Sequence, residues 1–217
     1  MFTLFRIDGP VYAFLKRLTN MMIVSLYWVL CCIPIFTIGP ATAAMYYVSL
    51  KIARGEEPPI TRSFFHSFKD NFKQGSLITL LLGVIGIVLY IDYWIIPDMT
   101  GTIKTVLSVI FIFFGFCYVL ICTYVFPLLA QFANTIRQTL KNAFILSVRY
   151  LPRSILMIVY NLLPGLVFWF FPNFFFKYLP LWLFVAPGAV AALCAIQLHK
   201  IFQPLIEPAE EELPEKT

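Results

Sequence analysis

Long uncharged segments separated by short basic ones dominate the pattern of hydrophobic and polar positions along the chain. The uncharged segments cover residues 18–50, 74–91, 105–136, 154–176 and 178–199. They are apolar on every face and lack the alternation of barrel strands, and a helix needs about 20 apolar residues to cross a bilayer. The pattern therefore predicts membrane-spanning helices at about 75–96, 105–130, 151–172 and 178–199.

The first uncharged segment and its flank, residues 18–52, are too long for one crossing. A straight helix of this length would measure about 50 Å, against a bilayer core of about 30 Å, and Gly39-Pro40 interrupts it. Either 20–36 enters the membrane and 40–52 returns as a hairpin, or 20–38 crosses once and leaves the N-terminus outside. Basic residues on both flanks favour the hairpin. The segment also resembles a secretory signal, which its length and the apolar sequence after it disfavour.

Composition places the whole chain in the membrane class. Of the 217 residues, 16 are Lys or Arg and 11 are Asp or Glu, so 12% are charged. Ordinary soluble domains have roughly 25%. Phenylalanine alone accounts for 23 residues, and the mean hydropathy is +0.84. These values exclude a soluble enzyme, a disordered chain and a disulfide-stapled module. They predict an all-α polytopic integral membrane bundle, with residues 1–199 as a single membrane domain.

The basic residues predict the orientation of the chain. Segments 51–73 and 131–153 carry most of the Lys and Arg, whereas the turns near Asp98 and Lys177 carry little charge. Cytoplasmic loops are enriched in Lys and Arg, so both basic segments and the C-terminus are placed in the cytoplasm. Residues 203–217 are acidic and rich in proline, which predicts a disordered tail.

Two basic amphipathic segments, 61–73 and 132–149, are expected to lie as helical elbows at the cytoplasmic surface. Each precedes two spans, so 61–130 and 132–199 resemble two copies of an elbow–helix–helix unit; alternatively, any basic helix beside a membrane has this pattern. The expected apolar stripe of the second elbow consists of Ile136, Leu140, Phe144 and Ile145. The residues expected to dock on lipid or on a partner protein are Phe64, Phe68, Lys69, Phe72, Lys73, Arg137, Lys141 and Phe144.

Few residues carry catalytic or metal-binding chemistry. The two histidines, His66 and His199, have no ligand spacing, and the five cysteines match no zinc or iron–sulfur motif. Asp92 lies beside Tyr93 and Trp94, a pattern typical of a helix end at the membrane interface. We therefore expect no enzymatic activity, no cofactor, no metal and no nucleic-acid partner.

Breaks in the apolar segments are the candidate ligand-binding positions. Gly39 permits an unusual turn and Pro40 suits the first turn of a helix. Thr42 follows where the free N–H groups of that helix begin, and Asn161 is a polar residue near the middle of a predicted span. A bound hydroxyl-rich or anionic group would explain these four residues. Structural turns and bends are the alternative explanation.

Three sequence features together resemble the YesL-like family of bacterial membrane proteins. They are GPATAAMYY at 39–47, Lys51 with Arg54-Gly55-Glu56, and the aromatic and basic elbow at 64–74. The resemblance implies about five membrane helices and no established biochemical activity. It also implies an association with carbohydrate-import systems of Gram-positive bacteria, and it supplies no catalytic residues.

Two functions of different classes follow from these observations. The first is a non-catalytic accessory protein of the bacterial plasma membrane, associated with the permease subunits of an ABC-type carbohydrate uptake system. The alternative is an autonomous carrier or channel for a small polyhydroxylated solute. An enzyme acting on lipid ranks last, because Asp92 and Asp98 are predicted to lie on the opposite side of the membrane from His66. A homo-oligomer is compatible with either of the first two.

Overall fold

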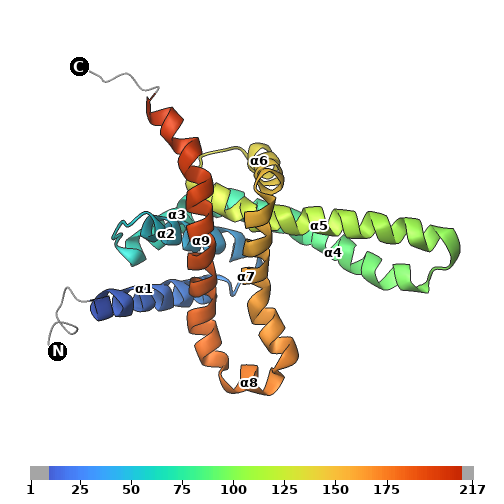
Figure 1. The fold of residues 1–217 in the computed structure, drawn as a ribbon, viewed down its shortest axis with the longest axis horizontal. Coiled ribbons are helices and arrows are strands. Elements are labelled where there is room, and N and C mark those ends of the chain that lie inside the picture. The colour runs from blue at the N-terminus through green and yellow to red at the C-terminus, as the bar shows by residue number, and fades with distance from the viewer. Residues whose placement is uncertain (1–9, 212–217) are drawn as a thin grey trace.

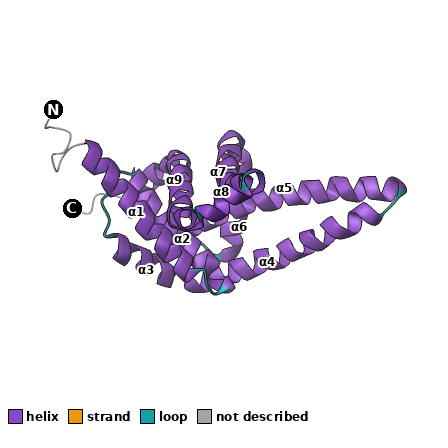
Figure 2. Ribbon diagram, turned by 90° about the horizontal axis from the view of Figure 1, so that it is seen from below, coloured by secondary structure: helices purple, strands orange, loops and turns teal. Residues whose placement is uncertain are grey.

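The computed structural model describes residues 10–211, and within this range every regular element is a helix (Figures 1 and 2). This confirms the all-α prediction. The long helices alternate with short ones because basic or proline-containing segments interrupt the apolar sequence. The elements are α1 (Pro10–Cys31), η1 (Ile35–Thr37), α2 (Ile38–Ala53), α3 (Ile60–Asp70), α4 (Phe72–Ile95), η2 (Ile96–Asp98), α5 (Gly101–Gln131), α6 (Ile136–Arg149), α7 (Leu151–Phe170), α8 (Pro172–Lys177) and α9 (Leu179–Glu211).

Among the described residues, four helical segments are long and apolar enough to cross a bilayer. They match the four predicted spans and confirm a polytopic membrane bundle. The segments are Phe72–Asp98, Gly101–Gln131, Leu151–Phe170 and Leu179–Leu205.

Helix α2 forms the centre of the fold. None of its side chains is exposed, and it contacts α1, α3, α4, α5 and α9. Alanines at 41, 43 and 44, all fully buried, allow neighbouring helices to approach closely. Its 16 residues span about 24 Å, less than the bilayer core. The structure therefore places a short buried helix where sequence predicted the second half of a hairpin.

Helices α1 and α2 lie side by side and are joined by a tight turn at residues 32–37 (Figure 1). The indole Nε1 of Trp28 donates to Oγ1 of Thr42 at 3.0 Å, linking the end of α1 to the start of α2. The break expected at Gly39-Pro40 thus begins slightly earlier in the chain. The hairpin and the single crossing both stay predictions for residues 18–52.

Two apolar hairpins leave the shared core in different directions. Figure 1 shows the α4–α5 hairpin running to the right and the α7–α8–α9 hairpin running downward. The buried residues of α4 and α5 lie only at the ends that join the core, and no residue from 83 to 119 is buried. We call residues 83–119 the arm.

The order short helix, long helix, long helix occurs twice, as α3–α4–α5 and as α6–α7–α9. This order is what the proposed repeat requires, but the two hairpins pack differently, and the repeat stays a prediction. Helix α9 continues to Glu211, so residues 203–211 are helical where a disordered tail was expected. The rest of that tail, residues 212–217, lies outside the described residues.

Candidate functional site

A cavity of about 410 Å³ lies between α1, α2, α7, α8 and α9. It brings together Thr42 and Asn161, two candidate ligand residues that are far apart in the sequence, and leaves out Gly39 and Pro40. Its walls are mainly aromatic and apolar, with a few polar groups, as in many small-molecule sites. The lining residues are Trp28, Thr42, Met45, Tyr46, Asn161, Pro164, Phe175, Trp182, Leu183, Ala186, Pro187, Val190 and Ala191.

The polar groups of this cavity already have partners within the protein. Thr42 Oγ1 donates to the carbonyl of Ile38 at 2.7 Å and accepts from Trp28. Asn161 Nδ2 donates to the carbonyl of Met157 at 2.8 Å and approaches the Cys194 sulfur at 3.5 Å. These bonds satisfy the donors that a membrane interior would otherwise leave exposed. A solute would have to use the remaining acceptor positions or displace an existing bond.

Gly39 and Pro40 have a packing role in this structure. A Cβ on Gly39 would collide with the Thr79 hydroxyl and the Gly75 carbonyl, and would lie 2.8 Å from the Phe126 ring. A Cβ on Gly75 would lie 2.7 Å from the Pro40 nitrogen. The start of α2 and the start of α4 therefore touch backbone to backbone. This contact needs glycine on both sides.

The first elbow is α3 with the beginning of α4. Phe64 is fully buried and packs against Tyr27 with ring centroids 5.6 Å apart. It anchors α3 to α1 and is not available for docking. Phe68 is half-buried, whereas Phe72, Lys69 and Lys73 are exposed and remain accessible to lipid or to a partner.

The second elbow, α6, packs against the rest of the protein through a face other than its expected apolar stripe. Its buried residues are Thr139, Ala143, Leu146 and Ser147, because small side chains let α6 lie closely against α5. Phe144 and Ile145 of the expected apolar stripe are 41% and 48% exposed, so they remain accessible to lipid or to a partner. Arg137 and Lys141 are exposed as well. The accessible face of α6 is therefore both cationic and apolar.

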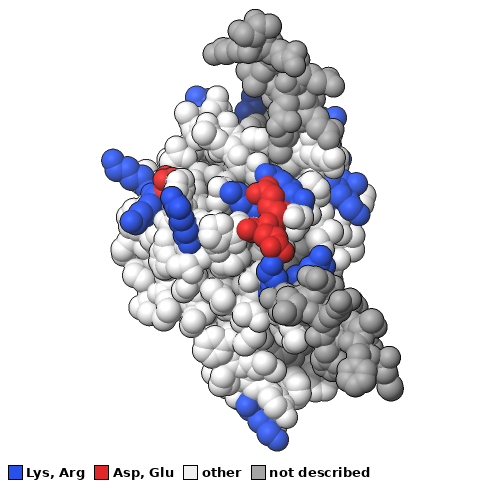
Figure 3. Space-filling model, turned by 90° about the vertical axis from the view of Figure 1, so that its left-hand side faces the viewer, with Lys and Arg blue, Asp and Glu red and all other residues white. Residues whose placement is uncertain are grey.

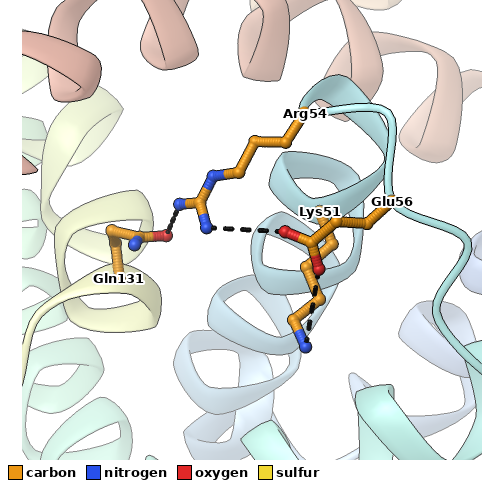
Figure 4. Close-up of polar contacts among 4 residues, drawn as sticks. All are labelled: Lys51, Arg54, Glu56 and Gln131. Carbon is orange, nitrogen blue, oxygen red and sulfur yellow. Dashed lines mark hydrogen bonds and ion pairs between the residues drawn. The ribbon is translucent and has the colours of Figure 1, made fainter.

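Lys51 and the Arg54-Gly55-Glu56 sequence, which carry part of the family resemblance, cap the C-terminus of α2. Gly55 has a φ of +82°, and the N–H of Glu56 bonds to the Lys51 carbonyl, which forms a Schellman cap. The Glu56 carboxylate lies 4.0 Å from Lys51 Nζ and 3.8 Å from Arg54 Nη1. Arg54 also donates to Gln131 at the end of α5 (Figure 4). This cluster ties the ends of α2 and α5 together.

The charged residues gather at the end of the molecule that carries the α2–α3 connection. Figure 3 shows Lys and Arg spread over this end around a central patch of Asp and Glu, with a smaller acidic spot among the basic side chains at the upper left. His66 Nδ1 pairs with Asp70 at 2.7 Å on the outside of α3. Within the described residues, no three His, Cys, Asp or Glu side chains lie close enough to hold a metal ion.

Comparison with known proteins places the chain among bacterial relatives. It is 32% identical to the uncharacterized protein YteU of Bacillus subtilis (strain 168) over 151 residues, covering 65% of this chain and 68% of YteU. It is 24% identical to the uncharacterized protein YesL of the same organism over 187 residues, covering 86% of this chain and 75% of YesL. No solved structure matches the chain.

The family described as "Protein of unknown function, DUF624" matches residues 21–93. This segment runs from α1 through most of α4 and includes the buried α2, the Gly39–Gly75 contact and the cluster at Arg54. The family pattern thus covers the centre of the fold. These matches confirm the resemblance noted from the sequence, and the chain belongs to the YesL-like family, a family of unknown biochemical function.

Proposed function

We propose that this protein is a non-catalytic accessory subunit of an ABC-type carbohydrate uptake system. It lies in the bacterial plasma membrane with its C-terminus in the cytoplasm. The membrane-crossing helices and the positive-inside pattern support this placement. The link to carbohydrate uptake rests on what the family resemblance implies. The proposed contact with permease subunits is inferred from the exposed surface of the arm.

The arm is the observation that carries the proposal. Residues 83–119 are mostly apolar, with charges only at Asp92, Asp98 and Lys104, and none of them is buried by the other described residues. A protein that acts alone has little need for a hairpin that packs on nothing else, whereas an accessory subunit needs surface to pack on its partner. Membrane helices associate through close van der Waals packing, so an uncovered hairpin supplies a ready contact surface.

The arm also contains open spaces that a partner helix could fill. An apolar cavity of about 350 Å³ separates α4 from α5 and contains Asp92 among its lining residues. A Cβ added to Gly83 or to Gly115 would meet no atom within 4 Å. Small residues with open space beside them are typical of positions where another membrane helix approaches.

Affinity purification from native membranes in mild detergent tests this proposal. We expect transporter permease subunits to co-purify with the wild-type protein and to be depleted by Gly115→Leu, since leucine would occupy the open space on the arm. The matched control is Gly165→Leu on α7, which also has open space but lies outside the arm. Mass spectrometry identifies the partner. Equal recovery of permease with both variants would contradict a contact through the arm.

A carrier is the second candidate, and the cavity that joins Thr42 to Asn161 is the observation that favours it. Its aromatic walls and amide side chain suit a small polyhydroxylated solute. The internal hydrogen bonds of these residues weigh against it, which is why we rank it second.

The carrier hypothesis predicts sugar flux into proteoliposomes that Asn161→Leu and Thr42→Val reduce by about tenfold or more, because each removes a hydrogen-bonding group from the cavity. Thr123→Val is the matched control. The Thr123 hydroxyl also donates to a helix carbonyl, that of Val119 at 2.8 Å, but lies outside the cavity. Flux that falls equally in the control would argue against a solute site here.

A further inference from the structure

Two arginines flank one tyrosine ring where α6 meets α7. The Arg149 guanidinium carbon lies 5.7 Å from the centroid of the Tyr150 ring, and that of Arg153 lies 5.8 Å from it. Cations held over an aromatic ring lose some of their mobility but keep their hydrogen-bond donors. The corner therefore presents two guanidinium groups around a common aromatic ring.

Arg153 is further oriented by helix α9. Its Nη1 donates to the carbonyl of Lys200 at 3.2 Å. In a regular helix this carbonyl would accept from residue 204, but residue 204 is proline and has no N–H. The carbonyl is thus left for Arg153. The bond uses one donor of a group that has five, so several remain for a ligand.

Among the described side chains, no carboxylate balances the positive charge of this corner. The ion pairs found among the described side chains join Lys16 to Glu57, Lys51 and Arg54 to Glu56, and His66 to Asp70. All of them lie on α1, α2, α3 or the α2–α3 connection. Neither Arg149 nor Arg153 pairs with a carboxylate in the described part of the chain. Guanidinium groups in such a setting are well suited to bind phosphate.

We infer that the corner formed by Arg149, Tyr150 and Arg153 binds an anionic phosphate group, supplied by a phospholipid headgroup. The corner lies at the start of α7, one of the membrane-crossing segments, with Arg153 in the first turn of that helix, so it lies at headgroup depth. On the same helix as Arg149, Phe144, Ile145 and Val148 are 41–48% exposed. An exposed apolar face beside cations is the pattern of a helix that lies in the membrane interface. This inference does not depend on a transporter partner.

Native mass spectrometry of the full-length protein in neutral detergent tests the inference. Phosphatidylglycerol and phosphatidylcholine with identical acyl chains are added separately, and glycerol 3-phosphate is added as a headgroup without chains. The variants are Arg149→Gln/Arg153→Gln and Arg149→Gln alone. The single variant is included because the Arg149 side chain makes no hydrogen bond to the described residues whose loss could disturb folding. The control is Lys177→Gln, since Lys177 also lies over a tyrosine, 5.7 Å from the Tyr178 ring, at the far turn of the hairpin. Size-exclusion chromatography checks that each variant is folded.

We expect the wild-type protein to prefer phosphatidylglycerol to phosphatidylcholine. The preference should fall by about thirtyfold in the double variant. Each Lys or Arg near an anionic membrane surface strengthens binding by about 1 kcal/mol, which is more than fivefold in affinity, and the two contributions add. The single variant should lose part of it, and Lys177→Gln should keep it. Equal binding of both lipids to the wild-type protein, or an equal loss in Lys177→Gln, would overturn the inference. Glycerol 3-phosphate binding as tightly as the lipid would overturn the assignment to a headgroup.

Discussion

Replacing Gly39 with alanine should destabilise the protein far more than the same change at a glycine with open space beside it. The added Cβ would meet the Gly75 carbonyl and the Thr79 hydroxyl, and the backbone of α4 cannot rotate away as a flexible side chain could. Inserted carbon atoms in a packed core cost about 1–3 kcal/mol, and more where backbone must move. We expect the melting midpoint in detergent to fall by roughly 10 °C.

Gly115→Ala is the control for this change. Gly115 also lies inside a helix, but a Cβ there would meet no atom within 4 Å. Alanine is the better helix former by roughly 0.5–1 kcal/mol, so this variant should be as stable as the wild-type protein or slightly more stable. Fluorescence-detected size-exclusion melting compares the two. Equal melting midpoints for both variants would show that α2 and α4 do not touch as described.

Gly188→Ala should separate α9 from α1. The Gly188 N–H donates to Ser25 Oγ at 2.8 Å, and a Cβ on Gly188 would lie 2.6 Å from that same oxygen and collide with the Met21 carbonyl. The substitution therefore adds a clash and breaks a buried hydrogen bond. We expect a loss of about 2–4 kcal/mol in stability and weaker accumulation in membranes.

The sequence offers a matched control for Gly188. Gly165 also follows a proline inside a membrane helix, but a Cβ there would meet no atom within 4 Å. Gly165→Ala should accumulate like the wild-type protein. If Gly188→Ala behaved like Gly165→Ala, measured by membrane abundance and melting midpoint, the contact between α1 and α9 would be contradicted. The two variants together distinguish the close approach of α9 to α1 at Gly188 from a general effect on stability of replacing a glycine that follows proline.

Much of the fold could be predicted from the spacing of charged residues. The membrane helices need uncharged sequence of bilayer length, so their positions follow from where Lys, Arg, Asp and Glu are absent. The central place of α2 could not be found in this way, because a helix surrounded by protein and one surrounded by lipid are both apolar. Its alanines at 41, 43 and 44 are a signal that could have pointed to it, since small residues favour helix packing.

Only part of the candidate site could be predicted from the sequence. Polar residues within apolar segments singled out Thr42 and Asn161, and both line one cavity. Trp28 and Tyr46 complete that cavity, but aromatic residues are so frequent in this chain that composition could not distinguish them. The apolar stripe of α6 could be predicted from its large apolar residues, but the face that packs on α5 could not, because close packing there selects small residues such as Ala143.

Site-specific photo-crosslinking in living cells tests the accessory role most directly. A photoreactive amino acid is placed at Ile112 on the arm and, as the control, at Leu162 on α7, both exposed apolar positions in membrane helices. We expect Ile112 to form an adduct with a transporter permease subunit, identified by mass spectrometry, and Leu162 to form none. Adducts of Ile112 with lipid alone, or with a second copy of this chain alone, would contradict the accessory role.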